Sequence, residues 1–197
     1  MKIRELGKIN KFYFGYEDIA RALSISLPSA RVTASRYVRQ GFLVRVKKNV
    51  YVLKEKWKVA GREEKFMIAN LAQVPSYISL MTALDYFEIT TQVQRDFFES
   101  VAVQRTKEIS VNHTVFQYTK IDRKLYFGFT KQKGFFMATP EKAFLDAVYL
   151  MSFGRYNVDL ASLVFSKLDI GALEHMSKKF PPKTQKLLEK HGYLKKA

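Results

Sequence analysis

The spacing of apolar positions predicts three helices in the first forty residues. Apolar side chains recur at three- and four-residue intervals within Ile3–Lys11, Tyr16–Leu23 and Leu27–Gln40, and this interval places side chains on one face of a helix. Gly41 follows the third segment, where a helix commonly ends on a residue that tolerates the left-handed backbone conformation. The pattern therefore indicates a compact helical start to the chain.

The two faces of the third predicted helix differ in charge. One face carries uncharged residues, which are Ala30, Ala34, Tyr37 and Val38. The opposite face carries Val32, Ser35, Arg36 and Arg39, with Arg31 on its flank. We therefore expect the uncharged face to pack against the protein and the basic face to remain free.

A β-hairpin is predicted directly after this helix. Phe42–Val46 begins an alternation of apolar and polar residues, and Val50–Leu53 is a second apolar run. Lys47, Lys48 and Asn49 lie between the two runs, and asparagine is one of the few residues that tolerates a left-handed turn. Three helices followed by a hairpin predict a winged helix-turn-helix.

This arrangement suggests contact with double-stranded DNA, whose major groove admits an α-helix. The expected contacts to bases or phosphates are Arg31, Ser35, Arg36 and Arg39 from the helix. Lys47 and Lys48 at the turn are expected to contact the DNA backbone. The alternative is that these charges are solvated on a module that binds protein.

The remainder of the chain predicts an α+β domain. Helices are expected over Arg62–Gln73, within Ser76–Glu88 beginning after a cap at Ser79, and after Thr139. Five runs rich in β-branched and aromatic residues predict an antiparallel meander: Phe98–Gln104, Glu108–Val111, Thr114–Ile121, Leu125–Phe129 and Phe135–Thr139. Three shorter helices are expected near Leu160–Lys167, Ala172–Lys179 and Lys183–His191.

A polar segment at residues 54–61 is the best candidate boundary between two domains. We therefore predict a winged helix-turn-helix DNA-binding domain at residues 1–56 and a C-terminal domain at residues 62–197. The fold class predicted for the whole chain is α+β, with an antiparallel sheet and C-terminal helices in the second domain.

Net charge strengthens the expectation of a polyanionic partner. The 197 residues carry a formal charge of +16, and residues 1–60 hold 14 basic and 4 acidic side chains, a net charge of +10. The chain has no cysteine, which excludes disulfides and thiolate sites. No run of about 18 uncharged apolar residues occurs, and the first residues lack an apolar core of signal-peptide length. We expect a cytoplasmic protein with no membrane partner.

Nothing in the sequence favours catalysis, so we expect no enzymatic activity, metal or cofactor. His113, His175 and His191 lie far apart, without the spacing of metal ligands. The phosphate-loop, dinucleotide-binding and nucleophile-elbow motifs are absent. Lys142 and Asp146 are four residues apart on one predicted helix, as in a surface ion pair. The 11 Tyr and 16 Phe residues favour an aromatic core over a base-stacking surface.

Three segments beyond the hairpin carry a resemblance to a known family. They are YISLMTALDYFEI (Tyr77–Ile89), FGF (Phe127–Phe129) and MATPEKAFLDAVYL (Met137–Leu150). Together with the preceding winged helix, they resemble the AbiEi antitoxins of bacterial abortive-infection systems. The resemblance covers nearly the whole chain, and TPEKAFLD is its most specific part.

The resemblance implies a repressor that binds repeated operator sequences of its own operon and a C-terminal domain that counters a nucleotidyltransferase toxin of the AbiEii type. Such type IV pairs need not form a stable complex. By position, the DNA-binding helix is Leu27–Gln40 and the wing is Leu43–Leu53. Asn49 and Glu88 stand where the family commonly has glycine.

Lys142 and Asp146 are the candidates for an antitoxic surface, with an ordinary structural ion pair as the alternative. The alternative function is a transcriptional regulator whose C-terminal domain is an adaptor or dimerisation module without antitoxin activity.

Overall fold

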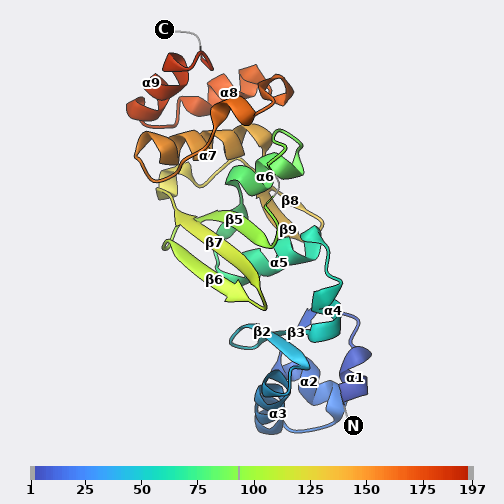
Figure 1. The fold of residues 1–197 in the computed structure, drawn as a ribbon. Helices are drawn as coiled ribbons and strands as arrows, with labels where there is room; N and C mark the ends of the chain where they lie inside the picture. Colours follow the sequence, from blue (N-terminus) through green and yellow to red (C-terminus); the bar gives the residue numbers. More distant parts are fainter. Residues whose placement is uncertain (1–2, 93, 195–197) are drawn as a thin grey trace. The chain divides into compact units, whose positions relative to one another are not determined.

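The structure is a computed structural model that describes residues 3–92 and 94–194 (Figure 1). The fold is mixed α+β and contains a three-stranded and a six-stranded sheet. The chain divides into two compact units, which are described separately below. Unit 1 comprises Met1–Ile68 with Ser110–His113, and unit 2 comprises Ala69–Ile109 with Thr114–Ala197. The boundary expected from the sequence, between residues 56 and 62, stays a prediction.

Unit 1 begins with three helices and a small antiparallel sheet. The helices are α1 (Ile3–Gly7), α2 (Tyr16–Leu23) and α3 (Leu27–Arg39). The strands are β1 (Tyr13–Phe14), β2 (Leu43–Lys47) and β3 (Val50–Leu53), in the spatial order β1-β3-β2. The expected helices and the hairpin are confirmed, although α1 is shorter than predicted. The two-residue strand β1 was not predicted, because two residues are too few to show a period.

The core of unit 1 consists of side chains from all these elements. It contains Leu6, Phe14, Ile19, Leu23, Ala30, Ala34, Tyr37, Leu43, Tyr51 and Leu53. Ala30, Ala34 and Tyr37 are therefore on the packed face of α3, as the sequence predicts. Small residues at two of these positions allow α3 to approach α2 closely, because their side chains occupy little space between the helices.

The segment expected to separate the domains is a helix, α4 (Lys54–Lys58). Trp57 is buried, and the Lys56 ammonium donates hydrogen bonds to the carbonyls of Ile9 and Lys11, each at 3.0 Å. The helix α5 (Arg62–Ala72) follows. Residues 54–58 are thus packed structure within unit 1 rather than an open linker.

Unit 2 contains a six-stranded sheet in the order β6-β7-β5-β4-β9-β8. Its strands are β4 (Ser76–Ile78), β5 (Phe97–Ala102), β6 (Lys107–Val111), β7 (Thr114–Lys120), β8 (Phe129–Gln132) and β9 (Phe135–Ala138). The pairs β4–β5 and β8–β9 are antiparallel, whereas β4–β9 and β5–β7 are parallel. The predicted antiparallel meander is therefore wrong. Side-chain alternation defines the two faces of a strand but not its neighbours. The three-residue strand β4, which ends just before the predicted cap Ser79, was not predicted.

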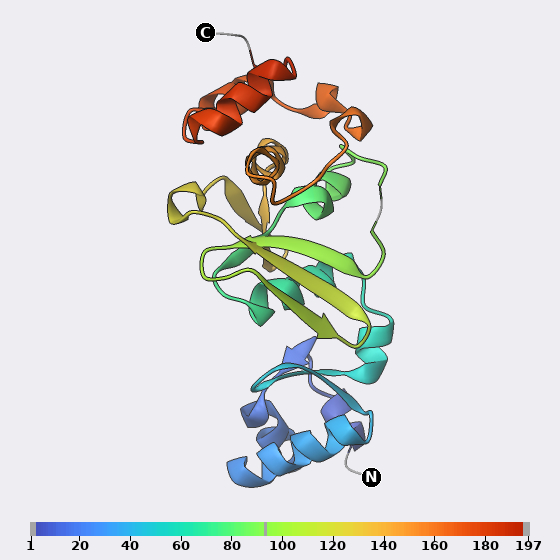
Figure 2. The ribbon, with the colours of Figure 1, turned by 60° about the vertical axis from the view of Figure 1, so that its left-hand side comes forward.

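Helices cover unit 2 in two layers. α6 (Leu80–Tyr86) and α7 (Pro140–Ser152) pack against each other, and α7 lies between the sheet and the pair α8 (Ile170–Ser177) and α9 (Pro182–Lys190) (Figure 2). Short 3-10 turns occupy Arg123–Leu125, Leu160–Ser162 and Phe165–Lys167. Because α7 has neighbours on both sides, nearly all its residues are buried.

Candidate nucleic-acid interface

The ends of α3 are defined by local sequence. The Ser26 hydroxyl caps the helix by accepting a hydrogen bond from the Ser29 amide at 3.3 Å, and Pro28 lies in the first turn. Gly41 follows with a φ of 74°, a left-handed conformation that glycine adopts without steric cost. These local signals define where α3 begins and where it ends.

All four residues of α3 that were predicted to contact DNA are exposed, namely Arg31, Ser35, Arg36 and Arg39. The Arg31 guanidinium lies over the Tyr16 ring at 5.6 Å, and the Arg36 guanidinium lies over the Tyr37 ring at 5.5 Å. Such cation–π contacts limit the conformations of the two arginines while leaving them accessible. The structure therefore brings the predicted helix residues onto one exposed basic surface of unit 1, which we call the α3 face.

The hairpin turn is anchored to the start of α2. Asn49 has a φ of 60°, and its side-chain oxygen accepts a hydrogen bond from the Tyr16 amide, while its side-chain nitrogen donates to Glu17 at 3.3 Å. A Cβ atom at Gly15 would come within 2.9 Å of the side-chain oxygen of Asn49, so a larger residue there would displace the Asn49 side chain that anchors the turn. Lys48, in the turn, is exposed, and so is Lys47 at the end of β2.

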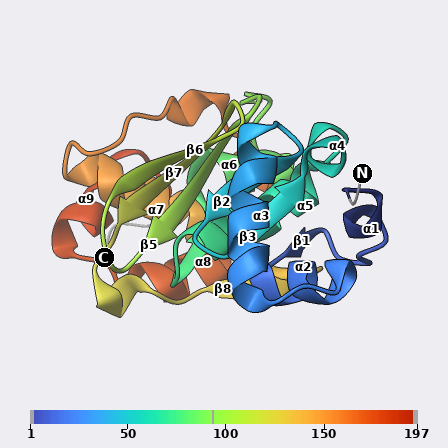
Figure 3. The ribbon, with the colours of Figure 1, turned by 90° about the horizontal axis from the view of Figure 1, so that it is seen from below.

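A hollow of about 220 Å³ lies between α3 and the hairpin, which pack side by side (Figure 3). Its lining residues are Ser35, Val38, Arg39, Arg45 and Tyr51. Burial raises the pKa of Tyr51 to about 12, with the Tyr16 hydroxyl bonded to it as a second cause. The phenol therefore stays neutral, and the two arginines supply the positive charge of the hollow.

Arg45 is not among the residues that the sequence predicts to contact DNA. It is exposed on β2 and pairs across the strands with Tyr51. The signal was present, because Arg45 is the polar position in the alternation of Phe42–Val46. The side of the hairpin on which it lies becomes apparent only once the packing of α3 against β2 is known.

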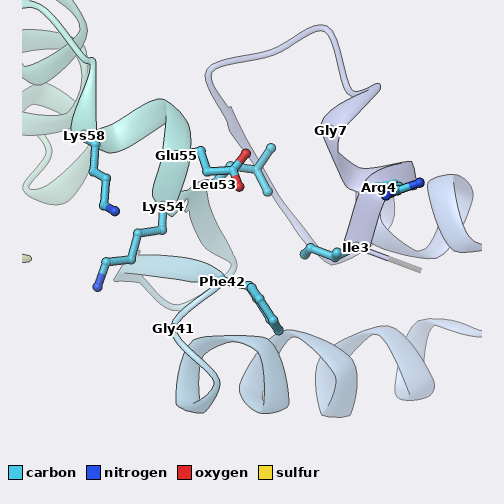
Figure 4. Close-up of a pocket in the computed structure, with 9 residues that line it drawn as sticks. All are labelled: Ile3, Arg4, Gly7, Gly41, Phe42, Leu53, Lys54, Glu55 and Lys58. Atoms are coloured by element: carbon cyan, nitrogen blue, oxygen red, sulfur yellow. The ribbon is translucent and has the colours of Figure 1, made fainter. Parts of the chain in front are cut away.

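A second hollow in unit 1, of about 320 Å³, lies among α1, the start of β2 and α4 (Figure 4). Apolar side chains of Ile3, Phe42 and Leu53 line it. The ammonium groups of Lys54 and Lys58 lie on one side of Figure 4 and the Arg4 guanidinium on the other. These charges do not converge on one point, unlike the polar groups that orient a ligand in a small-molecule site.

The expected surface position of Lys142 and Asp146 is wrong. Both side chains are fully buried in unit 2, where they form an ion pair one helical turn apart on α7. The four-residue spacing predicted the pair correctly. Its burial could not be predicted, because the residues that cover the pair, such as Tyr77, Gly128 and Phe180, come from distant parts of the chain.

The partners of the pair come from the resemblance segments. The Tyr77 and Ser79 hydroxyls donate to Asp146 at 2.9 and 2.8 Å, and the Lys142 ammonium donates to the Tyr77 oxygen at 2.8 Å. Gly128 of the FGF segment has a φ of 70°, and a Cβ atom there would lie 2.9 Å from the Lys142 side chain. The three segments therefore meet at one buried polar cluster, the Lys142 cluster, defined as Tyr77, Ser79, Lys142 and Asp146.

This cluster also explains a local departure from the sequence prediction. Ser79 precedes α6, but its side chain makes no capping hydrogen bond. Its hydroxyl is instead used by Asp146. Burial raises the pKa of Asp146, while the Lys142 charge and the hydroxyl donors oppose that shift. The cluster satisfies its own charges within the core and offers no exposed surface.

Within residues 3–92 and 94–194, no group of three or more histidine, aspartate or glutamate side chains is arranged to hold a metal ion. His113 and His175 are exposed and lie in different units. Of the helices in the same residues, none has the length and apolar character needed to cross a membrane.

A similar fold occurs in the RV2827C protein from Mycobacterium tuberculosis. Its crystal structure matches with a TM-score of 0.58 and 11% sequence identity, over 96% of this chain and 75% of the other. At this identity the likeness concerns the fold alone. A scan against protein-family models and a search of curated proteins found no match.

Proposed function

We propose that this chain is a DNA-binding transcriptional repressor whose N-terminal region is a winged helix-turn-helix. In this proposal, α3 enters the major groove and the β2–β3 turn lies beside the adjacent phosphate backbone. The observation that carries the proposal is the α3 face, on which Arg31, Arg36 and Arg39 are exposed together. Arginine is the residue that pairs best with guanine edges and with phosphates.

The hollow between α3 and the hairpin adds support. Arg39 from the helix and Arg45 from the strand line the same depression, together with the Ser35 hydroxyl. A phosphate group fits such a set of donors, because guanidinium and hydroxyl groups are its usual partners. A helix and a hairpin that hold a phosphate between them would fix the orientation of α3 in the groove.

The second part of the proposal is an antitoxin function for the C-terminal region, directed against a nucleotidyltransferase toxin. The resemblance to AbiEi antitoxins supports it, and the three segments that carry the resemblance meet at the Lys142 cluster. Because that cluster is buried, its proposed role is to hold the domain together, and an antitoxic surface lies elsewhere in unit 2. The alternative is a regulator whose C-terminal region is an adaptor or dimerisation module.

Gel shifts with the DNA upstream of the chain's own operon test the first part. The wild type should bind this DNA more tightly than scrambled DNA, and Arg36→Ala with Arg39→Ala should remove most of that difference. Lys178→Ala with Lys186→Ala is the matched control, because it removes the same charge from exposed positions in unit 2. Equal affinity for both DNAs would contradict the repressor proposal.

Salt dependence provides a second test of the same geometry. The logarithm of affinity should fall linearly with the logarithm of salt concentration, because bound cations displace counterions from phosphates. Lys48→Ala, at the turn, should reduce the slope by about one. A slope that is unchanged in this variant would place the turn away from the DNA backbone.

Growth rescue tests the antitoxin part. The full chain with Arg36→Ala and Arg39→Ala is expressed with a nucleotidyltransferase encoded in the same operon. Rescue of growth by this variant, which is expected to be defective in DNA binding, is the result expected of an antitoxin. Growth arrest despite normal amounts of folded variant would favour the adaptor alternative.

A further inference from the structure

An apolar side chain lies in the middle of the α3 face. Val32 is 68% exposed, in the N-terminal half of α3, with Arg31 beside it and Ser35 and Arg36 one turn later. Side chains three and four positions apart on a helix are neighbours. Val32 is therefore flanked on its C-terminal side by polar groups that the proposed function directs toward DNA, and Pro28 lies one turn before it.

Packing and helix propensity do not account for valine at this position. Its side chain is mostly in water, so little apolar burial stabilises the fold there. A β-branched residue also disfavours a helix relative to alanine or a long polar residue. A partner that covers the side chain when the protein acts would give valine a physical role at this position.

The chemistry of the major groove indicates what covers it. Among the four bases, only thymine presents a methyl group there, and aliphatic side chains contact that group. The first half of the helix is also the part that reaches base edges in helix-turn-helix proteins. Arginine and serine beside Val32 have donors for phosphates or for the polar edges of other bases, but valine has none.

We propose that Val32 contacts the 5-methyl group of a thymine in the major groove and so determines one base of the recognised sequence. This inference rests on the proposed function. It goes further by naming the base and the atom that a particular residue recognises. The contact distinguishes thymine from cytosine, because cytosine lacks the methyl group and presents an amino group on the same edge.

The test uses full-length protein and a site selected from random DNA by the wild type. Each thymine of that site is replaced in turn by deoxyuridine, which pairs identically but lacks the methyl group. At one position the replacement should weaken wild-type binding about fourfold, the effect of one buried methyl group. Val32→Ala should bind the thymine site about fourfold more weakly and should not distinguish thymine from deoxyuridine there.

Two controls separate this contact from indirect effects. Val59→Ala removes the same atoms from a side chain that is 84% exposed at the end of α4, and it should still distinguish the two bases. The melting temperature of Val32→Ala should be equal to or slightly above that of the wild type, because alanine favours a helix. A loss of affinity in a stable variant is then a loss of contact.

The outcomes distinguish this inference from the proposed function. If the wild type selects a sequence but Val32→Ala responds to every deoxyuridine as the wild type does, only the inference is overturned. A change in self-association of Val32→Ala without thymine dependence would also overturn it and assign the side chain to a protein contact. If the wild type selects no sequence, the proposed function fails and the inference fails with it.

Discussion

Helices α3 and α7 both carry charged residues, yet their charges have opposite environments. Arg31, Arg36 and Arg39 on α3 are exposed, whereas Lys142 and Asp146 on α7 are fully buried. The helices have the same length, 13 residues, and each follows a capping residue and has a proline in its first turn. Their local sequence signals are therefore similar, and the difference arises from the charges and from what surrounds them.

The difference shows which charges a protein core accepts. No acidic residue occurs within α3, so burial of its arginines would leave charges without partners, at a cost of several kcal/mol per ion. Lys142 and Asp146 neutralise each other, and hydroxyl groups satisfy their remaining hydrogen bonds. A helix whose charges have partners can be covered on every side, while a helix with one sign of charge needs solvent or an external polyanion.

The largest expected effect comes from separating the buried pair. Asp146→Ala leaves the Lys142 ammonium beside one hydroxyl and the rings of Tyr77, Phe127 and Phe180, at 5.1–5.4 Å. The free energy of unfolding should fall by about 3–5 kcal/mol, as for other broken buried pairs. Urea denaturation of the wild type and the variant measures this difference in the free energy of unfolding.

The double variant Lys142→Met with Asp146→Asn provides the control. Because it removes both charges, keeps similar volume and retains an oxygen that accepts from the Tyr77 and Ser79 hydroxyls, it should recover most of the lost stability. Equal destabilisation by the single and double variants would mean that shape, and not an unpaired charge, determines the effect.

The next largest effect is the pH dependence of stability that arises from the buried carboxylate of Glu99. Within the part of the chain that the structure describes, the hydrogen-bond partners of this carboxylate include no lysine or arginine. Glu99 on β5 accepts hydrogen bonds from the Met81 amide and the Tyr156 hydroxyl, at 3.2 and 2.9 Å. Burial raises its pKa from 4.5 to about 7 in the folded state, although these hydrogen bonds oppose the shift. The folded protein then holds a proton that the unfolded chain has released.

Stability should therefore decrease as pH rises from about 4.5 to 7, by about 3 kcal/mol for Glu99 alone. Below the unfolded pKa this contribution is fully present, and above pH 7 it is lost. Subtracting the pH profile of Glu99→Gln isolates the contribution from that of Asp146, whose pKa is shifted in the same direction. Parallel profiles of wild type and variant would contradict the assignment.

Smaller effects are expected at two positions that hold a left-handed backbone without glycine. Glu88 has a φ of 56° at the end of α6, and Asn49 has a φ of 60° in the hairpin turn. Glu88→Gly should raise the free energy of unfolding by about 0.5–1 kcal/mol, because glycine relieves the steric cost and the exposed ion pair with Lys167 contributes little.

The same substitution at Asn49 should lower the free energy of unfolding instead of raising it. Asn49→Gly loses the hydrogen bond from the Tyr16 amide that anchors the turn, so stability should fall by about 1 kcal/mol. Thermal denaturation of both variants makes the comparison, and a gain at Asn49 would show that the anchor contributes nothing.

The smallest stability change is expected on α3. Arg36→Ala with Arg39→Ala should alter the free energy of unfolding by no more than about 0.5 kcal/mol, because exposed charges contribute little to folding and a cation–π contact of an exposed arginine, such as that of Arg36 with Tyr37, is worth about that much. The same variant should lose most of the specific DNA affinity. A large loss of stability would show that these arginines hold unit 1 together and would remove the contrast with α7.

Much of unit 1 could be predicted from the sequence because its signals are local. The period of α2 and α3, the glycine after α3 and the asparagine in the turn each act within a few residues. The exposed face of α3 followed from its helical periodicity alone, because that periodicity places the basic residues on one side of the helix. In unit 2 most strands were found, but β4 was not, and the predicted strand Leu125–Phe129 overlaps β8 only at Phe129. Of the neighbours that a meander implies, β6–β7 and β8–β9 are adjacent, whereas β5 and β4 have neighbours that were not predicted.

The sequence by itself therefore determined the helices and the hairpin of unit 1, its basic charge and the four-residue pairing of Lys142 with Asp146. Only the tertiary structure decided the mixed order of the large sheet, the position of Arg45 beside α3 and the burial of the Lys142 cluster. Tyr77 and Ser79 reach Asp146 from 69 and 67 residues away. Periodicity is a property of neighbouring residues, whereas such partners are brought together by the packing of the whole unit.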